Sequence, residues 1–80
     1  MKVTNKTKVD LMIMGVPLKE DETRNCPERC FDALVVTSEI GECIIKTDCK
    51  QRTIEISGSL RAEETEANEF GLTNILIYQQ

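Results

Sequence analysis

The stretch of residues 31–57, FDALVVTSEIGECIIKTDCKQRTIEIS, constrains the fold most, because apolar and polar residues alternate in it through three short runs. Successive side chains of a strand point to opposite faces of a sheet, so this alternation is typical of half-buried strands. Short interruptions at 40–41 and 48–51 separate the runs and indicate tight turns. We therefore predict a three-stranded antiparallel meander over residues 31–57.

The register of this meander can be tested for consistency. A two-residue turn at 40–41 sets Val36 opposite Ile45, and a loop over 48–51 sets Ile45 opposite Ile54. A slip of one residue in either hairpin would move the apolar residues to the other face. With this register, one face is apolar throughout and is predicted to cover the core: Leu34, Val36, Cys43, Ile45, Ile54 and Ile56. The other face is mixed and mostly wettable: Ala33, Val35, Thr37, Ile44, Lys46, Thr53, Glu55 and Ser57.

Two further strands are predicted outside the meander. Residues 6–16 alternate loosely and become apolar on both sides, and residues 72–78 are rich in branched and aromatic side chains. Gly15 and Pro17 are expected to end the first of these strands, since proline cannot donate to a ladder. Residues 18–29 are polar and without periodicity, so we predict a loop with at most one helical turn.

Residues 60–69, LRAEETEANE, allow two interpretations. Good helix formers lie between a capping Ser59 and a stopping Gly71, which is typical of a short helix. The segment has little apolar content, so an ordered acidic loop is the alternative. The whole chain is thus predicted to be one mainly β domain over residues 1–80: a small antiparallel sheet or partly open barrel of about five strands, with the meander at its centre and a short helix or loop over 60–69.

Charge and hydropathy exclude several classes of function. The net charge is −4, and the excess lies in residues 54–80, which hold five glutamates against Arg61. A chain without a basic stripe is a poor nucleic-acid binder, so nucleic-acid partners are not expected. No apolar run approaches the ~18 residues that a membrane span requires, so no membrane association is expected. We predict a cytoplasmic location, where thiols stay reduced.

The four cysteines do not follow the C-x₂-C spacing of common zinc knuckles. In the predicted register Cys43 points into the apolar face, and it lies roughly 13 Å from the end of the sheet where the other three gather, at ~3.3 Å per residue. Cys43 is therefore predicted to be a buried core thiol.

Three alternatives remain for Cys26, Cys30 and Cys49. Three ordinary reduced thiols are expected in the cytosol. In an oxidising compartment Cys49 can form a disulfide with Cys30 or Cys26, which would make the chain a small disulfide-stabilised domain. The third alternative is a zinc-binding module in which Cys26, Cys30 and Cys49 are thiolate ligands.

Catalytic motifs are missing from this sequence. There is no histidine, which excludes Ser-His and Cys-His pairs and histidine general bases. No glycine-rich phosphate loop is present either. We predict that the protein is not an enzyme and uses no cofactor.

The remaining hypothesis is a protein-binding module: a regulator, an inhibitor or an assembly subunit, expected to form homo-oligomers such as a homodimer. Two groups of residues are candidates for partner binding. An acidic group could meet a basic partner surface, in one version by imitating the phosphates of a nucleic acid: Glu63, Glu64, Glu66 and Glu69. An apolar group exceeds what one meander face can cover: Met12, Met14, Ile75, Ile77 and Tyr78.

Overall fold

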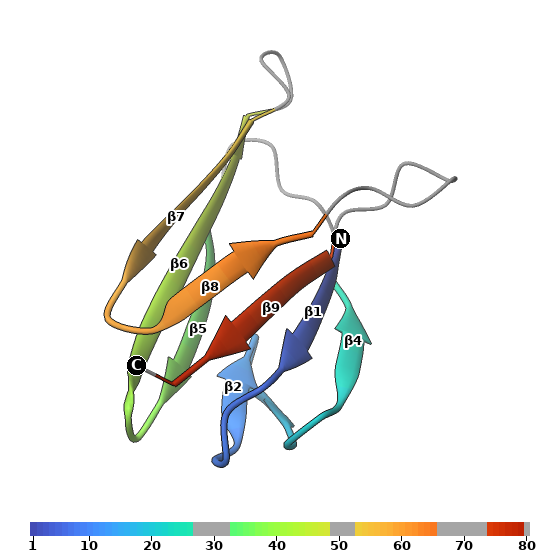
Figure 1. Cartoon of the computed structure of the whole chain (residues 1–80), viewed down its shortest axis with the longest axis vertical. Coiled ribbons are helices and arrows are strands. Elements are labelled where there is room, and N and C mark those ends of the chain that lie inside the picture. Colours follow the sequence, from blue (N-terminus) through green and yellow to red (C-terminus); the bar gives the residue numbers. More distant parts are fainter. Residues whose placement is uncertain (27–32, 49–52, 66–73, 80) are drawn as a thin grey trace.

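The computed structural model describes residues 1–26, 33–48, 53–65 and 74–79, and these residues form two packed β-sheets (Figure 1). Nine strands are present in the described residues: β1 (Lys2–Asn5), β2 (Leu11–Ile13), β3 (Val16–Leu18), β4 (Thr23–Asn25), β5 (Ala33–Ser38), β6 (Gly41–Asp48), β7 (Thr53–Gly58), β8 (Arg61–Glu64) and β9 (Asn74–Tyr78). The mainly β class is confirmed. The number of strands is larger than the predicted five. Several of the strands have only three or four residues, and such short strands show too little alternation to be recognised in the sequence.

Two sheets of different size make up the fold. The four-stranded sheet has the order β4-β1-β9-β8, and the five-stranded sheet has the order β3-β2-β5-β6-β7. Figure 1 shows β8 crossing in front of β6 and β5 at an angle, with β9 and β1 beside β8 in the front layer. Neighbouring strands are antiparallel except β1 and β9, which pair in parallel with Val3 beside Ile75. The sheets do not close into a barrel.

The predicted meander forms β5, β6 and β7, but its register differs from the prediction by two residues in each hairpin. Val36 pairs with Cys43, and Ile45 pairs with Ile56. A shift of two keeps every side chain on its predicted face. Leu34, Val36, Cys43 and Ile45 are accordingly at most 3% exposed, and Ile54 and Ile56 pack against them from the edge.

The first turn of the meander lies at residues 39–40 because Ser38 stabilises it there. The Ser38 hydroxyl accepts a hydrogen bond from the Ile40 N–H (3.2 Å) and donates one to the Gly41 carbonyl (3.0 Å). Gly41 occupies a strand position with φ of 148°, and any side chain there would collide with the Ser59 hydroxyl. Both this backbone conformation and the crowding by Ser59 therefore require glycine at position 41.

The predictions for the first part of the chain need correction. The single strand over 6–16 is instead a loop followed by the hairpin of β2 and β3, in which Gly15 lies in the turn and Pro17 lies within β3. Proline is tolerated there because β3 is at the edge of its sheet. The predicted loop over 18–29 contains strand β4.

Both alternatives predicted for residues 60–69, the short helix and the acidic loop, are wrong over residues 61–64, which form β8. Its residues are good helix formers, but their pairing with β9 sets Ala62 against Ile77, and this tertiary contact overrides local propensity. Residues 66–69 lie outside the described part of the chain. Ile75 and Ile77, predicted to be spare apolar groups, are fully buried between the sheets.

A buried polar network links the two sheets at the end of β1. Asn5 is fully buried, and its side-chain NH₂ donates to the carbonyls of Val9 (2.7 Å) and Leu18 (2.8 Å). Its carbonyl accepts from the Thr7 N–H (2.8 Å) and the Thr7 hydroxyl (2.6 Å). Because Asn5 ends β1 and Leu18 ends β3, this one amide joins the two sheets with all its hydrogen bonds satisfied.

Candidate protein-binding site

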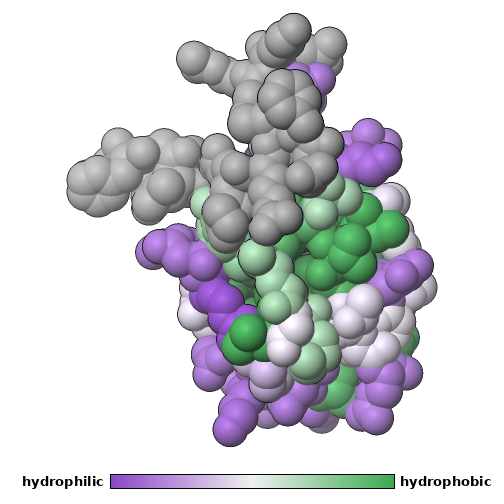
Figure 2. All heavy atoms as spheres, turned by 180° about the vertical axis from the view of Figure 1, so that it is seen from behind, coloured by the Kyte–Doolittle hydropathy of each residue, from purple (hydrophilic) through white to green (hydrophobic). Residues whose placement is uncertain are grey.

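Exposed apolar side chains gather on the outer face of the five-stranded sheet. Met12, Met14 and Val35 are 37%, 56% and 45% exposed, and Ile44 is half buried beside Val35. Met12 pairs with Thr37 on β5, which lies on the same face as Val35, and Met14 lies in the turn that follows β2. We call Met12, Met14, Val35 and Ile44 the apolar strip. Figure 2, seen from behind, shows hydrophobic surface on this face with hydrophilic residues around it.

Met14 holds an unusual backbone conformation at the tip of the β2–β3 hairpin. Its φ is 52° and that of Gly15 is 80°, so both central residues of this two-residue turn are left-handed. Such turns favour Asn-Gly, because an ordinary side chain in the left-handed region costs roughly 1 kcal/mol or more. Local turn chemistry therefore does not explain a methionine here. The turn holds its side chain out in solvent.

A shallow pocket of about 250 Å³ lies behind the hairpin tip, between the edges of the two sheets. Its lining residues are Ile13, Met14, Val16, Arg24, Asn25 and Cys26. The Arg24 guanidinium donates to the carbonyls of Val16 (2.9 Å) and Pro17 (2.6 Å), and Glu22 lies 3.9 Å from it. Arg24 thus ties β4 to β3 across the edge of the sandwich.

The two described cysteines are free, buried thiols. Cys43 is fully buried in the core, and burial raises the pKa of its thiol. Burial also raises the pKa of Cys26, against the opposing effect of Arg24 and the N-terminal ammonium. A raised pKa keeps the thiol protonated and unreactive at neutral pH.

The predicted metal and disulfide residues are only partly covered by the structure. Cys30 and Cys49 lie outside the described residues, so the disulfide and the three-thiolate zinc site remain predictions. In the described part of the chain, no group of three or more cysteine, aspartate or glutamate side chains is placed to hold a metal ion. No helix in that part is long and apolar enough to cross a membrane.

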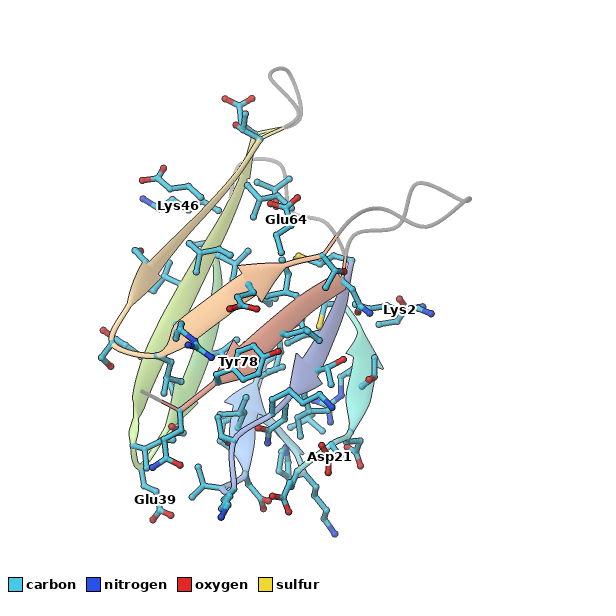
Figure 3. The ribbon with its side chains drawn as sticks, in the orientation of Figure 1. Lys2, Asp21, Glu39, Lys46, Glu64 and Tyr78 are labelled. Atoms are coloured by element: carbon cyan, nitrogen blue, oxygen red, sulfur yellow. The ribbon has the colours of Figure 1, made fainter. Side chains whose placement is uncertain are left out.

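The acidic group and the methionines lie on different sheets. Glu63 and Glu64 are exposed on β8, at the edge of the four-stranded sheet, and Glu66 and Glu69 are outside the described residues. Tyr78 is half buried on β9 under the Arg61 guanidinium, whose carbon is 4.7 Å from the ring centre. Figure 3 shows Glu64 at the end of β8 that is far from Tyr78.

The predicted partner-binding residues that the structure describes therefore lie on two separate surfaces. The sequence prediction included Met12 and Met14 but assigned Val35 and Ile44 to a mostly wettable face. Their place in the site could have been recognised from the sequence, because both are branched apolar residues at outward positions of adjacent predicted strands.

Comparisons of this chain with protein-family models, with curated proteins and with solved structures return no match.

Proposed function

We propose that this protein is a non-enzymatic protein-binding module that docks a partner protein on the apolar strip. The observation that carries the proposal is Met14, a large apolar side chain that is 56% exposed and lies in a left-handed turn position. Strained and exposed residues of this kind are found where function requires them. Exposed methionine adapts well to the shape of a partner surface.

The surroundings of the strip match the anatomy of a protein interface. Its centre is apolar, and Ile44 is flanked on the same face of β6 by exposed Glu42 and Lys46. Protein interfaces have apolar centres with polar rims. The mixed charges at the rim favour a partner with apolar contact residues and with charges of both signs around them.

Catalysis is not supported by the described residues. The two buried thiols have raised pKa values, and the sequence contains no histidine to activate a nucleophile. An acidic inhibitor with a basic partner is the second form of the hypothesis, and it uses Glu63 and Glu64 on the other sheet. The two surfaces can be tested independently.

Met14→Asn separates binding from folding. Asparagine favours the left-handed turn, so we expect this variant to be more stable by up to about 1 kcal/mol in urea unfolding. The apolar side chain is lost, so partner binding should weaken at least tenfold. Glu63→Gln with Glu64→Gln is the matched control on the other sheet, and it should leave binding unchanged.

The partner for this titration is obtained by placing a photo-crosslinking residue at position 35 and identifying the captured protein. The purified captured protein is then titrated by calorimetry against wild-type chain and the variants. Binding that is equal for wild type and Met14→Asn would contradict the proposal. Binding that is lost only in the glutamine variant would favour the acidic form instead.

A further inference from the structure

The edges of the two sheets differ in how they are protected against pairing. Edge strands present unpaired backbone groups, and proteins blunt them with short length, proline, charge or cover. β3 is three residues long, contains Pro17 and is covered by Arg24. β4 is also three residues long. β8 has four residues, of which Arg61, Glu63 and Glu64 are charged.

β7 is the least protected of these four edges by length, proline and charge. It is six residues long, TIEISG, without proline and with Glu55 as its one charged residue. Among the described strands, β6 is the only partner of β7, which ends the five-stranded sheet. Figure 1 shows β7 at the outer margin of the molecule.

The hydrogen-bond pattern shows which backbone groups face outward. Glu42 of β6 directs both its N–H and its carbonyl toward the β7 side, to the Ser59 hydroxyl (3.1 Å) and the Leu60 N–H (3.0 Å). Antiparallel ladders alternate, so even-numbered residues of β6 bond toward β7. Through the observed register these bond to odd-numbered residues of β7. The N–H and carbonyl groups of Ile54 and Ile56 therefore point away from the sheet.

We propose that β7 pairs antiparallel with β7 of a second copy of this chain, joining the two five-stranded sheets into one continuous sheet. The two-fold axis passes through Ile56, which lies opposite Ile56 of the other copy. This surface is distinct from the apolar strip, so the proposal stands independently of the proposed function.

The apolar inner face supports self-pairing in this register. Ile45, which is 1% exposed, lies opposite Ile56, and Ile54 and Ile56 are only half buried at the edge. Pairing about Ile56 extends this apolar row across the axis and covers the edge isoleucines. Cross-strand aliphatic pairs of this kind stabilise sheets.

Charge selects the same register. Centring the pair on Glu55 would set two carboxylates directly opposite each other, which is unfavourable. Centring it on Ile56 sets Glu55 opposite Ser57 of the second copy, while Lys46 lies beside Glu55 on β6. The β8 edge, with exposed Glu63 and Glu64, would repel a copy of itself.

Substitutions at position 57 test the register directly. Ser57→Lys places two lysines opposite the two Glu55 carboxylates of the dimer, and Ser57→Glu places two glutamates there. Position 57 is exposed on the outer face beside Ile44, so neither side chain enters the core of the single chain. We expect the dimer dissociation constant to fall about tenfold for Ser57→Lys and to rise about tenfold for Ser57→Glu.

Ile56→Pro and Ile56→Ala form the second pair. Both remove the isoleucine side chain, but only proline removes the outward N–H, and proline is compatible with an edge strand. Ile56→Pro should be monomeric at concentrations where Ile56→Ala still dimerises. Circular dichroism of each variant checks that the sheet is retained.

Sedimentation equilibrium and native mass spectrometry of the full chain measure all five proteins. A wild-type dimer that responds in opposite directions to the two position-57 variants supports the proposal. A wild-type chain that stays monomeric up to about 1 mM overturns it, and so does a dimer indifferent to position 57. Loss of a different protein partner in Ile56→Pro, with a monomeric wild type, would assign the edge to another chain and also overturn self-pairing.

Discussion

The two sides of the sandwich are built differently. On the side of β3 and β4, Arg24 joins the strands, Pro17 occupies the edge, and the buried Asn5 amide links the sheets. On the side of β7 and β8, the chain crosses between the sheets through Ser59 and Leu60, and both residues hydrogen-bond to Glu42 of β6. Side-chain hydrogen bonds hold the first side, and its edge strands have three residues each. The other side has the six-residue edge strand β7, for which we propose pairing with a second copy.

This difference shows that edge protection is local to particular residues rather than a property of the fold. The same chain protects its shortest edges most and its longest edge least. We propose that the side of β3 and β4 stabilises the fold and that the edge of β7 associates with another copy. Substitutions on each side test this assignment.

The largest expected effect is at Asn5, on the closed side. Asn5→Asp replaces two donors by an acceptor that faces the Val9 and Leu18 carbonyls. Losing buried hydrogen bonds and burying a charge should cost about 3–5 kcal/mol of unfolding free energy. Urea unfolding measures this, with Asn25→Asp on exposed β4 as control. Equal stability of the two variants would show that the closed side is not held by this network.

A smaller effect is expected from Arg24. Arg24→Met removes the two charged hydrogen bonds to the β3 carbonyls and should cost about 1–2 kcal/mol. Arg61→Met on the open side removes only the stacking of Arg61 over Tyr78, which is worth about 0.5–1 kcal/mol. Thermal unfolding under identical conditions compares them. A larger loss for Arg61→Met would reverse the assignment of the stabilised side.

The smallest expected effect is an alkaline loss of stability from Cys43. Its folded pKa is raised above 9.0 by burial, so its contribution is complete below that pH and is lost as the pH rises through the folded value. The slope is at most about 1.4 kcal/mol per pH unit. Cys43→Ala should flatten the stability profile above pH 9, measured by urea unfolding with a reductant present.

Cys26 provides the comparison on the closed side. Arg24 and the N-terminal ammonium oppose the rise of its pKa, so Cys26→Ala should flatten the profile less than Cys43→Ala. Equal dependence of stability on pH in Cys26→Ala and Cys43→Ala would show that Arg24 and the N-terminal ammonium do not distinguish the two thiols.

The core of the meander could be predicted from sequence, whereas the register could not. Alternation assigns Val36 and Ile45 to one face, and any shift by two residues gives the same assignment. The observed register depends on the Ser38 turn and on the crowding of Gly41 by Ser59, which follows β7 in the chain. The contact between Gly41 and Ser59 joins segments distant in sequence, so the alternation within the meander does not predict it.

The candidate site was predictable in part. Met12 and Met14 follow from apolar excess in a short segment, but the left-handed turn at Met14 does not, because its sequence lacks the usual Asn-Gly signal. The sequence of residues 61–64 favours a helix, but this segment forms β8 because it pairs with β9. Ile75 and Ile77 were misjudged because the second sheet, which buries them, was not foreseen.

The sequence by itself determined that the chain is mainly β and which side chains of the meander face the core, because the two-residue period of a strand is a local property. Only the tertiary structure decided that β1 and β9 lie side by side in parallel, that the apolar strip and the glutamates occupy different sheets, and that β7 is left at an edge. These features depend on pairing between distant segments, and the free energy of that pairing is not encoded in any one stretch.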